Sequence, residues 1–341
     1  MCDAPPRRLY TPSAWELAWR GRITRQPDGT RHWLSHCSIL KNETTEMGHW
    51  LELGAARTRT TGGSSHSKAA AAAIGTTMAG VDKAHLLDAP TEHWNASLIS
   101  YHSVVDGCGD VLRRVPIEPL VSFLRHPRHT CFNSVSYKYS RSYLFPIHAR
   151  EHQPFPPARC LFFDLGASLY SFGTGGASLQ WFVELYDSRG CRFQQKKSQD
   201  RILAWEAKPW NASFLFGAMP PRVQDVISYY NVPVDPTPGA RHNPWRAVSA
   251  LARPEDLVVV KLDIDHAAIE ERLVDQLLAN EKGVADLIDD FYYEHHVSDS
   301  PMLHQGWAQC KSCGAPTQTL AQSYNVFTRL RELGVRAHSW V

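Results

Sequence analysis

The sequence lacks the features that mark a membrane, exported or nucleic-acid-binding protein. No stretch among its 341 residues approaches the roughly 20 consecutive apolar residues of a membrane span. Arg7 and Arg8 lie near the N-terminus without an apolar run after them, so no classical signal peptide is expected. A formal net charge of +2 gives no electrostatic reason to expect nucleic acid or an anionic membrane as partner.

The cysteine spacing gives no indication of a disulfide framework, and the sequence contains no internal repeat. The eight cysteines form no framework, which predicts mostly reduced thiols and a cytoplasmic protein. Cys310 and Cys313 have half of a zinc-site spacing, but no second pair follows, so a thiol pair in a loop is expected and no metal site is predicted. The 43% hydrophobic and 21% charged residues are ordinary for a globular protein.

A proline cluster divides the chain. Pro154, Pro156 and Pro157 form a stiff segment, and we place a boundary there between an N-terminal extension, 1–157, and a second domain, 158–341. Within the extension, whose fold is unclear, we expect a helix at 11–19 capped by Ser13, and strands at 31–40 and 98–105. The Gly/Ser-rich residues 57–68 predict a flexible loop, followed by an alanine-rich helix.

Strands and helices alternate after residue 160. Apolar runs predict strands, and amphipathic segments between them predict helices. The expected strands are 161–165, 200–205, a short one within 223–234, 257–262, 285–293 and 335–341; the expected helices include 177–189, 267–280 and 317–333. Residues 257–262, Leu-Val-Val-Val-Lys-Leu, form the most apolar run and should be central. The pattern predicts an α/β protein with a doubly wound, mostly parallel Rossmann-like sheet.

Polar residues follow four of the predicted strands. Asp164 and then Gly166 follow the first, and Glu206 follows the second; Asp263 and Asp265 end the fourth, and Glu294, His295 and His296 end the fifth. Each could instead cap the following helix, a role that would suit Asp265. Because ligands bind at the carboxyl ends of parallel strands, we expect a site there, with Glu206 as acceptor for ribose hydroxyls.

The same segments resemble a known family. They are similar to the class I S-adenosylmethionine-dependent methyltransferases, most closely the FkbM type. The matching segments stand in the family's order: Phe162–Ser168, Ile202–Pro209, Val259–Asp265 and Phe291–His296. The resemblance covers about half of the chain, from residue 161 onward, and implies a methyltransferase-like sheet.

The resemblance also implies which residues bind the cofactor, S-adenosylmethionine. Asp164 and Gly166, with Ala167 and Ser168 of the same turn, would hold its methionine part. Glu206 would hold its ribose.

Catalytic residues are expected at the ends of the later strands. By resemblance, Asp263 would face both the cofactor and the methyl acceptor, with Asp265 beside it. Because residues two apart in an extended chain point to the same side, both carboxylates should face one pocket. His296 is a further candidate general base. The predicted function is O-methylation of a small molecule or glycan hydroxyl; the alternative is a non-catalytic binding or interaction protein on the same fold.

Overall fold

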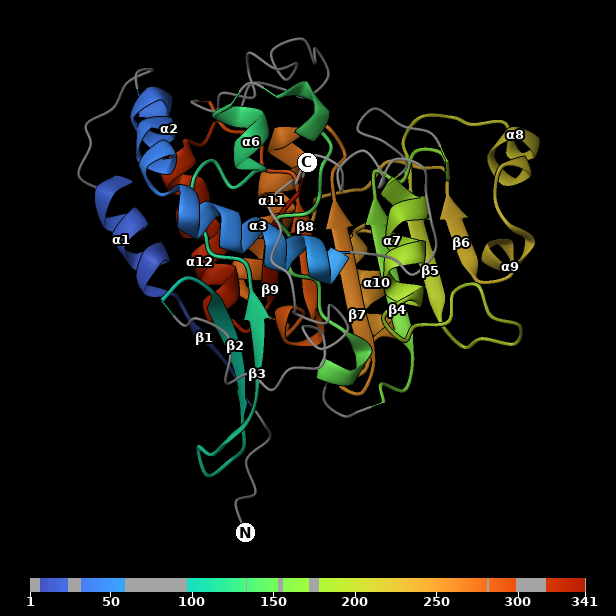
Figure 1. The fold of residues 1–341 in the computed structure, drawn as a ribbon. Coiled ribbons are helices and arrows are strands. Elements are labelled where there is room, and N and C mark those ends of the chain that lie inside the picture. The colour runs from blue at the N-terminus through green and yellow to red at the C-terminus, as the bar shows by residue number, and fades with distance from the viewer. Residues whose placement is uncertain are drawn as a thin grey trace, which may run out of the picture.

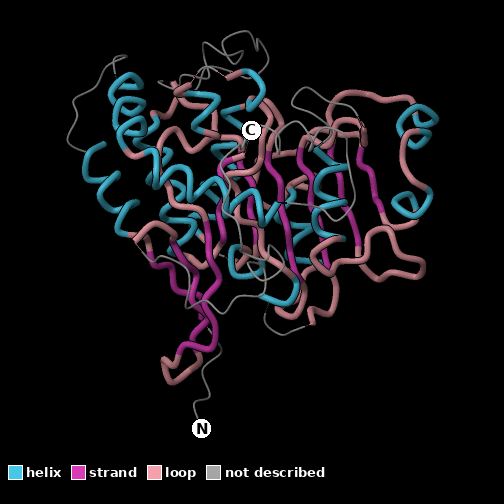
Figure 2. Tube along the Cα trace, in the orientation of Figure 1, coloured by secondary structure: helices cyan, strands magenta, loops and turns pink. Residues whose placement is uncertain are grey.

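The structure contains two sheets with helices around them (Figures 1 and 2). It is a computed structural model that describes residues 7–23, 32–58, 97–132, 134–152, 156–171, 178–280, 282–298 and 317–340. A six-stranded sheet is formed by the C-terminal half, and a three-stranded antiparallel sheet by the N-terminal part. The chain is therefore a mixed α/β protein, as predicted.

All six strands of the larger sheet are parallel. They are β4 (Cys160–Leu165), β5 (Arg201–Trp205), β6 (Ile227–Tyr230), β7 (Leu257–Leu262), β8 (Asp290–Tyr293) and β9 (Arg336–Ser339). Their spatial order is β6-β5-β4-β7-β8-β9, so the order reverses between β4 and β7. This is the strand order of the doubly wound Rossmann arrangement, and the reversal is its usual ligand position.

The central strands follow from their apolar sequences. Every residue of β4 and β7 is buried, as expected for parallel strands covered by helices on both faces. The prediction that 257–262 is central is confirmed, because β7 lies between β4 and β8.

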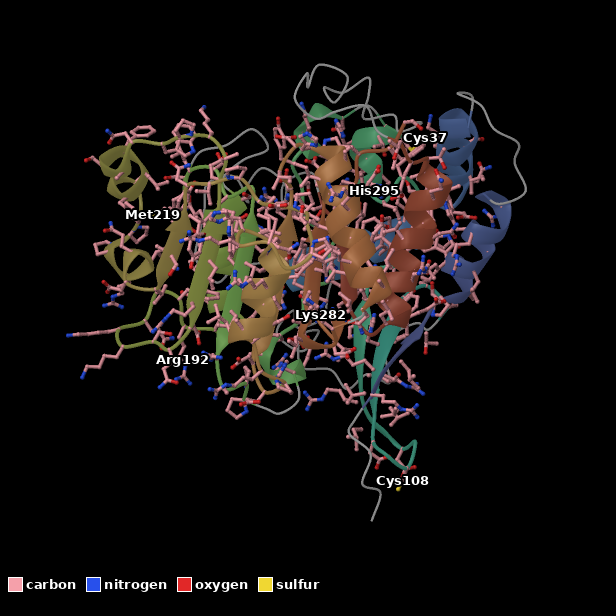
Figure 3. All side chains as sticks on the ribbon, turned by 180° about the vertical axis from the view of Figure 1, so that it is seen from behind. Cys37, Cys108, Arg192, Met219, Lys282 and His295 are labelled. Atoms are coloured by element: carbon pink, nitrogen blue, oxygen red, sulfur yellow. A yellow bond between two sulfur atoms is a disulfide. The ribbon has the colours of Figure 1, made fainter. Side chains whose placement is uncertain are left out.

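Helices cover both faces of this sheet (Figures 1 and 3). Helix α7 (Ser178–Asp187) lies on one face; α10 (Pro244–Leu251), α11 (Ala267–Ala279) and α12 (Leu320–Glu332) lie on the other. The short helices α8 (Ala212–Gly217) and α9 (Pro221–Gln224) lie beyond β6, and the 3-10 turn η4 (Ala285–Leu287) precedes β8. Helix α12 begins with a Thr319–Gln322 capping box and ends before Gly334, which has a φ of +92°, so its predicted stop is confirmed.

The N-terminal part contributes a second sheet and several helices. Its elements are β1 (Arg7–Thr11), α1 (Ala14–Ile23), α2 (His32–Asn42), α3 (Thr44–Thr58), β2 (Ser100–Val105), β3 (Val111–Ile117), α6 (Pro127–Thr130), η2 (Val135–Tyr137) and η3 (Ala149–Glu151). The expected first helix is confirmed, and Ser13 Oγ accepts a hydrogen bond from the Glu16 backbone N–H in its first turn. The strand expected at 98–105 is confirmed as β2.

One predicted element of this part is wrong, and another lies mostly outside the described residues. Residues 31–40 were expected as a strand, but the structure has helix α2 there. Cys37 and Leu40 are buried and three residues apart, which is helical spacing rather than strand alternation. The flexible loop predicted at 57–68 begins at the end of α3, and its remainder lies outside the described residues.

Buried ion pairs join the N-terminal part to the parallel sheet. Arg331 of α12 pairs with Glu118 at 3.1 Å, and Arg336 of β9 pairs with Asp290 of β8 at 2.9 Å. The His338 ring lies between these carboxylates, 2.9 Å from Glu118 and 3.2 Å from Asp290. The hydrophobic core is likewise continuous from α1 to the end of β9. The two predicted parts of the chain therefore share one core.

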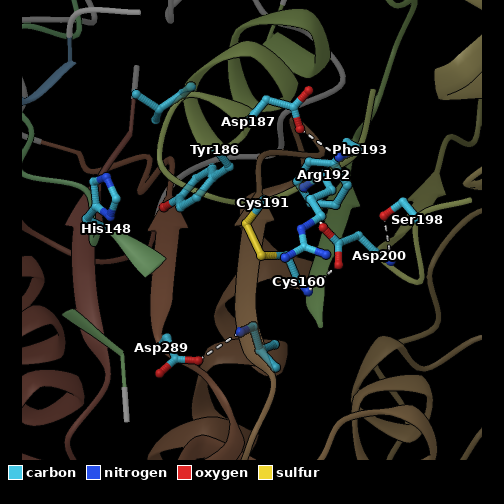
Figure 4. Close-up of a disulfide and its surroundings, with 12 residues drawn as sticks. His148, Cys160, Tyr186, Asp187, Cys191, Arg192, Phe193, Ser198, Asp200 and Asp289 are labelled. Atoms are coloured by element: carbon cyan, nitrogen blue, oxygen red, sulfur yellow. Dashed lines mark hydrogen bonds between the residues drawn. A yellow bond between two sulfur atoms is a disulfide. The ribbon is translucent and has the colours of Figure 1, made fainter. Parts of the chain in front are cut away.

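Disulfides correct the expectation of mostly reduced cysteines, because no cysteine among the described residues is free. Cys37 is bonded to Cys131, and Cys160 of β4 to Cys191 after α7 (Figure 4). The second lies beside Asp200, which accepts hydrogen bonds from the backbone N–H groups of Cys160 and Arg192. Because disulfides persist mainly in oxidising compartments, the pairs argue against the predicted cytoplasmic location. Within the described residues, no helix has the length and apolarity required to cross a membrane.

We predict that the Cys160–Cys191 disulfide stabilises the fold by restricting the unfolded chain. It joins residues 31 positions apart, so replacing both cysteines with alanine should lower the free energy of unfolding by about 3–4 kcal/mol. Denaturant unfolding measures this loss, and thiol labelling of the unreduced, denatured protein should leave both cysteines unmodified. Complete labelling of Cys160 and Cys191, with unchanged stability of the variant, would contradict the assignment.

Candidate functional site

The polar residues that follow the parallel strands meet at one edge of the sheet, uppermost in Figure 1. Strand β4 pairs with both β5 and β7, and β7 with β8, all parallel and in register to their last residues. The topology therefore brings Asp164, Glu206, Asp263 and Glu294 to the same edge. The predicted gathering of these residues is present in the structure.

Lys261 connects Asp164 of β4 to Asp263, which follows β7. Its side chain is 1% exposed, and its Nζ lies 3.1 Å from Asp164 Oδ1 and 3.3 Å from Asp263 Oδ2. It also donates a hydrogen bond to the Gly166 carbonyl at 2.9 Å. Burial opposes the charged ammonium, but the two carboxylates hold the pKa of Lys261 above its usual value. This residue was not among the predicted site residues, although a lysine within an otherwise apolar strand signals a buried ion pair.

Asp164 is enclosed rather than exposed to the edge. It is completely buried, and burial raises the pKa of its carboxyl despite the opposing effect of Lys261. Its second oxygen, Oδ2, has no hydrogen-bond partner among the described residues. A buried carboxylate oxygen without a donor is costly, so this atom can accept a bond from a ligand or water.

Asp263 is held from several sides. Lys261 is one partner, and Trp340 donates its indole N–H to Asp263 Oδ2 at 3.0 Å. Although burial acts to raise it, these groups and a hydrogen bond from Glu294 hold the pKa of Asp263 below its usual value. The Arg141 guanidinium lies over the Trp340 ring, 4.4 Å from the ring centroid. Asp263 is thus a fixed carboxylate at neutral pH.

Glu294 has the opposite protonation preference. Burial and the negative charge of Asp263 raise its pKa to about 8, although Arg125 lies 3.4 Å from its Oε1. Near pH 7 the two acidic groups therefore share a proton, with Glu294 as the donor to Asp263.

The Gly166 turn fits closely under the end of β7. Gly166 has a φ of +88°, and a Cβ there would lie 1.7 Å from the Asp263 backbone oxygen. The backbone N–H groups of Gly166 and Ala167 both donate to the Trp205 carbonyl, at 2.9 and 3.0 Å. The glycine is therefore explained by backbone packing alone, and Ala167 is buried beneath the turn.

Glu206 connects the end of β5 to this turn. Its two carboxylate oxygens accept hydrogen bonds from the backbone N–H groups of Ser168 at 3.2 Å and Lys208 at 2.6 Å. The Tyr229 hydroxyl donates to the Ser168 carbonyl at 2.8 Å, which fixes the same turn. Glu206 remains half-exposed, so its remaining lone pairs can reach a ligand.

Asp265 does not cap the helix that follows it. Helix α11 has His266 at its N-cap position, without a side-chain capping bond, so the capping alternative is wrong. Asp265 has a φ of +55°, which turns the chain and removes the extended geometry expected between it and Asp263. Its side chain is 61% exposed, and its Oδ1 lies 3.9 Å from His296 Nε2. Burial and the charge of Asp263 raise the pKa of this carboxyl.

His296 lies among three carboxylates. Its Nδ1 is 3.5 Å from Glu270 Oε2, and its Nε2 is 3.9 Å from both Asp265 Oδ1 and Glu294 Oε2. Burial acts against the charged ring, but Glu270 and Glu294 raise the pKa of His296 above its usual value. Glu270, in the first turn of α11, was missed by the sequence analysis because its role depends on a contact across the sheet edge.

The neighbouring histidine has a different environment. His295 turns away to Ser323 of α12, with 2.8 Å between its Nδ1 and the serine Oγ, and burial lowers the pKa of His295 to about 3. It lies at the upper end of the molecule in Figure 3. Of the two adjacent histidines, only His296 belongs to the acidic cluster. The Cys310–Cys313 pair lies outside the described residues.

Comparisons with known proteins identify no relative. No family model matches this chain, and searches among curated proteins and solved structures found no similar protein. The structure shows a Rossmann-like α/β fold with an acidic carboxyl edge, and the FkbM-type resemblance stays a prediction.

We predict that Gly166 is required for folding. Gly166→Ala combines a left-handed φ with a backbone clash, so it should lower the free energy of unfolding by more than about 2 kcal/mol. Gly239→Ala is the matched control, because Gly239 has a φ of +78° and no heavy atom within 4 Å of the added Cβ. Thermal unfolding compares them; equal losses would show that the contact with Asp263 is unimportant.

A second prediction concerns the buried ion pair. Lys261→Met leaves the Asp164 charge buried without its cation and should cost about 3–5 kcal/mol. The double variant Asp164→Asn/Lys261→Met removes both charges and should recover part of this loss in denaturant unfolding. If the double variant is less stable than Lys261→Met alone, the two charges do not depend on each other as described.

Proposed function

We propose that this protein is an S-adenosylmethionine-dependent methyltransferase of the FkbM type, acting on a hydroxyl group of a small molecule or glycan. The observation that carries the proposal is the contact between Glu206 and the Ser168 backbone at the sheet's point of reversal. It places an accessible carboxylate beside the turn after β4, where a nucleoside binds in open α/β sheets.

The residues at this position fit the cofactor. Glu206 retains lone pairs for the ribose hydroxyls, since each of its oxygens accepts one backbone hydrogen bond in the structure. Asp164 Oδ2 has no partner among the described residues, but Asp164 is completely buried, so an ammonium group such as that of the methionine part would reach it only after a movement of the turn that follows β4. Gly166, Ala167 and Ser168 supply the backbone of the turn.

The acceptor would lie on the other side of Lys261. The methyl group would come from S-adenosylmethionine: the acceptor oxygen would bond to the methyl carbon as the carbon–sulfur bond breaks, and the sulfur would keep the electron pair. Asp265 is the most exposed carboxylate of the edge and has a raised pKa, so it is suited to take the hydroxyl proton. Asp263 stays ionised and orients the reactants, while His296 Nε2 lies 3.9 Å from Asp265 Oδ1.

Ligand binding tests the proposal directly. Calorimetric titration of the full-length chain with S-adenosylhomocysteine should show binding. The dinucleotide NAD⁺ is the comparator, because the all-parallel order of the sheet is also that of dinucleotide-binding proteins. Binding of NAD⁺ alone would overturn the proposal. Binding of neither would favour the alternative, a non-catalytic interaction protein on the same fold.

We predict that Glu206 contributes to cofactor affinity through its charge. Glu206→Gln should weaken S-adenosylhomocysteine binding by about 1–3 kcal/mol, the scale for hydrogen bonds to a charged group. The control is Glu332→Gln, which makes the same chemical change at an exposed position at the end of α12. Equal affinities of both variants and the parent, measured by the same titration, would exclude Glu206 as the ribose acceptor.

A further inference from the structure

Three side chains at the carboxyl edge have the chemistry and spacing of metal ligands. Asp265, Glu294 and His296 each offer one ligand atom, and these atoms all lie within 4.8 Å of one another. They come from the ends of two adjacent strands, β7 and β8. We propose that Asp265, Glu294 and His296 bind a divalent transition-metal cation, which adds a site to the proposed function and does not depend on it.

The distances between the three ligand atoms fit one shared cation if these atoms move slightly closer together. Nitrogen and carboxylate ligands lie about 2.0–2.2 Å from Mn²⁺-sized or Zn²⁺-sized ions, so two ligands on one ion are about 3–4.4 Å apart. His296 Nε2 is 3.9 Å from Asp265 Oδ1 and 3.9 Å from Glu294 Oε2. Shifts of a few tenths of an ångström by the side chains therefore suffice, and Asp265 is exposed enough to move.

Glu270 supplies an independent indication. It is fully buried, its Oε1 accepts a hydrogen bond from the Ile264 backbone N–H, and its Oε2 is the oxygen that faces His296. That Oε2 lies 3.5 Å from His296 Nδ1, on the ring edge opposite the proposed ligands. Metal-binding histidines commonly point the second ring nitrogen at a carboxylate, which fixes the tautomer and leaves the other nitrogen free to ligate.

The charge of the region favours a bound cation. Four carboxylates, those of Asp263, Asp265, Glu270 and Glu294, lie around His296 and the end of β7. Lys261 is shared between Asp263 and the buried Asp164, and Arg125 contacts Glu294 at 3.4 Å. A divalent ion at the three proposed ligands would replace the proton that Glu294 shares with Asp263.

The ligand set favours manganese-like chemistry. One imidazole with two carboxylates lies between the nitrogen- and sulfur-rich sites of zinc and the all-oxygen sites of magnesium. Mn²⁺ is therefore the probe for this site. A second cluster, Cys160, Cys191 and Asp200, is no alternative, since its two sulfur atoms are bonded to each other.

If the proposed function is correct, the cation would lie beside Asp263 and next to the acceptor. Its open coordination positions would then bind acceptor oxygens, and acceptors with two adjacent hydroxyl groups would be preferred. This consequence rests on the proposed methyltransferase activity, whereas the cation site itself does not.

The test is calorimetric titration of chelator-treated full-length protein with MnCl₂, in the absence of any nucleoside. The parent should bind one Mn²⁺ per chain. Asp265→Asn, a change on an exposed side chain, should weaken binding at least about tenfold, and Glu270→Gln by about 10- to 100-fold. Asp225→Asn, the same change at an exposed position after α9, should bind as the parent does.

The outcomes separate this site from the proposed function. Absence of Mn²⁺ binding, or binding that Asp265→Asn and Glu270→Gln leave unchanged, would overturn the cation site even if S-adenosylhomocysteine binds. Mn²⁺ binding that only these two variants weaken would support the site even if S-adenosylhomocysteine fails to bind. Melting temperatures near that of the parent confirm that the variants are folded.

Discussion

The carboxyl edge of this protein depends on one buried cation, Lys261. A lysine in the middle of a parallel sheet is stable only if carboxylates offset the loss of water, and Asp164 and Asp263 do so from the two central strands. Its third contact, with the Gly166 carbonyl, fixes the turn after β4. The ends of β4 and β7 are therefore held together by charge and backbone contact at the point where ligands bind in sheets of this order.

A second buried network connects the last strand of the sheet to the N-terminal part of the chain. Strand β9 is its last strand, and an edge strand leaves backbone groups open to pairing with other chains. Arg336 of β9 donates hydrogen bonds to the carbonyls of Pro116 and Phe145, which belong to the N-terminal part. Removing the N-terminal part would uncover these charges as well as apolar surface, so it functions as part of the fold.

The features that depend only on local sequence could be predicted from it. The buried strands β4 and β7 follow from apolar runs, and the polar ends of the strands follow from the parallel topology. Helix α2 was wrongly predicted as a strand, although the buried residues Cys37 and Leu40 are three positions apart, which is helical spacing. The disulfides, the role of Glu270 and the turn at Asp265 could not be predicted, since each depends on a tertiary contact or on a φ that no short motif specifies.

Lys261 also divides the candidate site into two chemically different halves. On the side of β4 and β5, the turn is held by backbone hydrogen bonds, and Glu206 is the accessible carboxylate. On the side of β7 and β8, ionisable side chains dominate, with His296 between carboxylates. We proposed a nucleoside for the first half, since such a ligand needs shape and a few hydrogen bonds, and a cation for the second half. Because different residues form the two halves, the proposed nucleoside and cation sites can be altered independently by substitution. Asp263 is the residue through which either proposed site would influence the other.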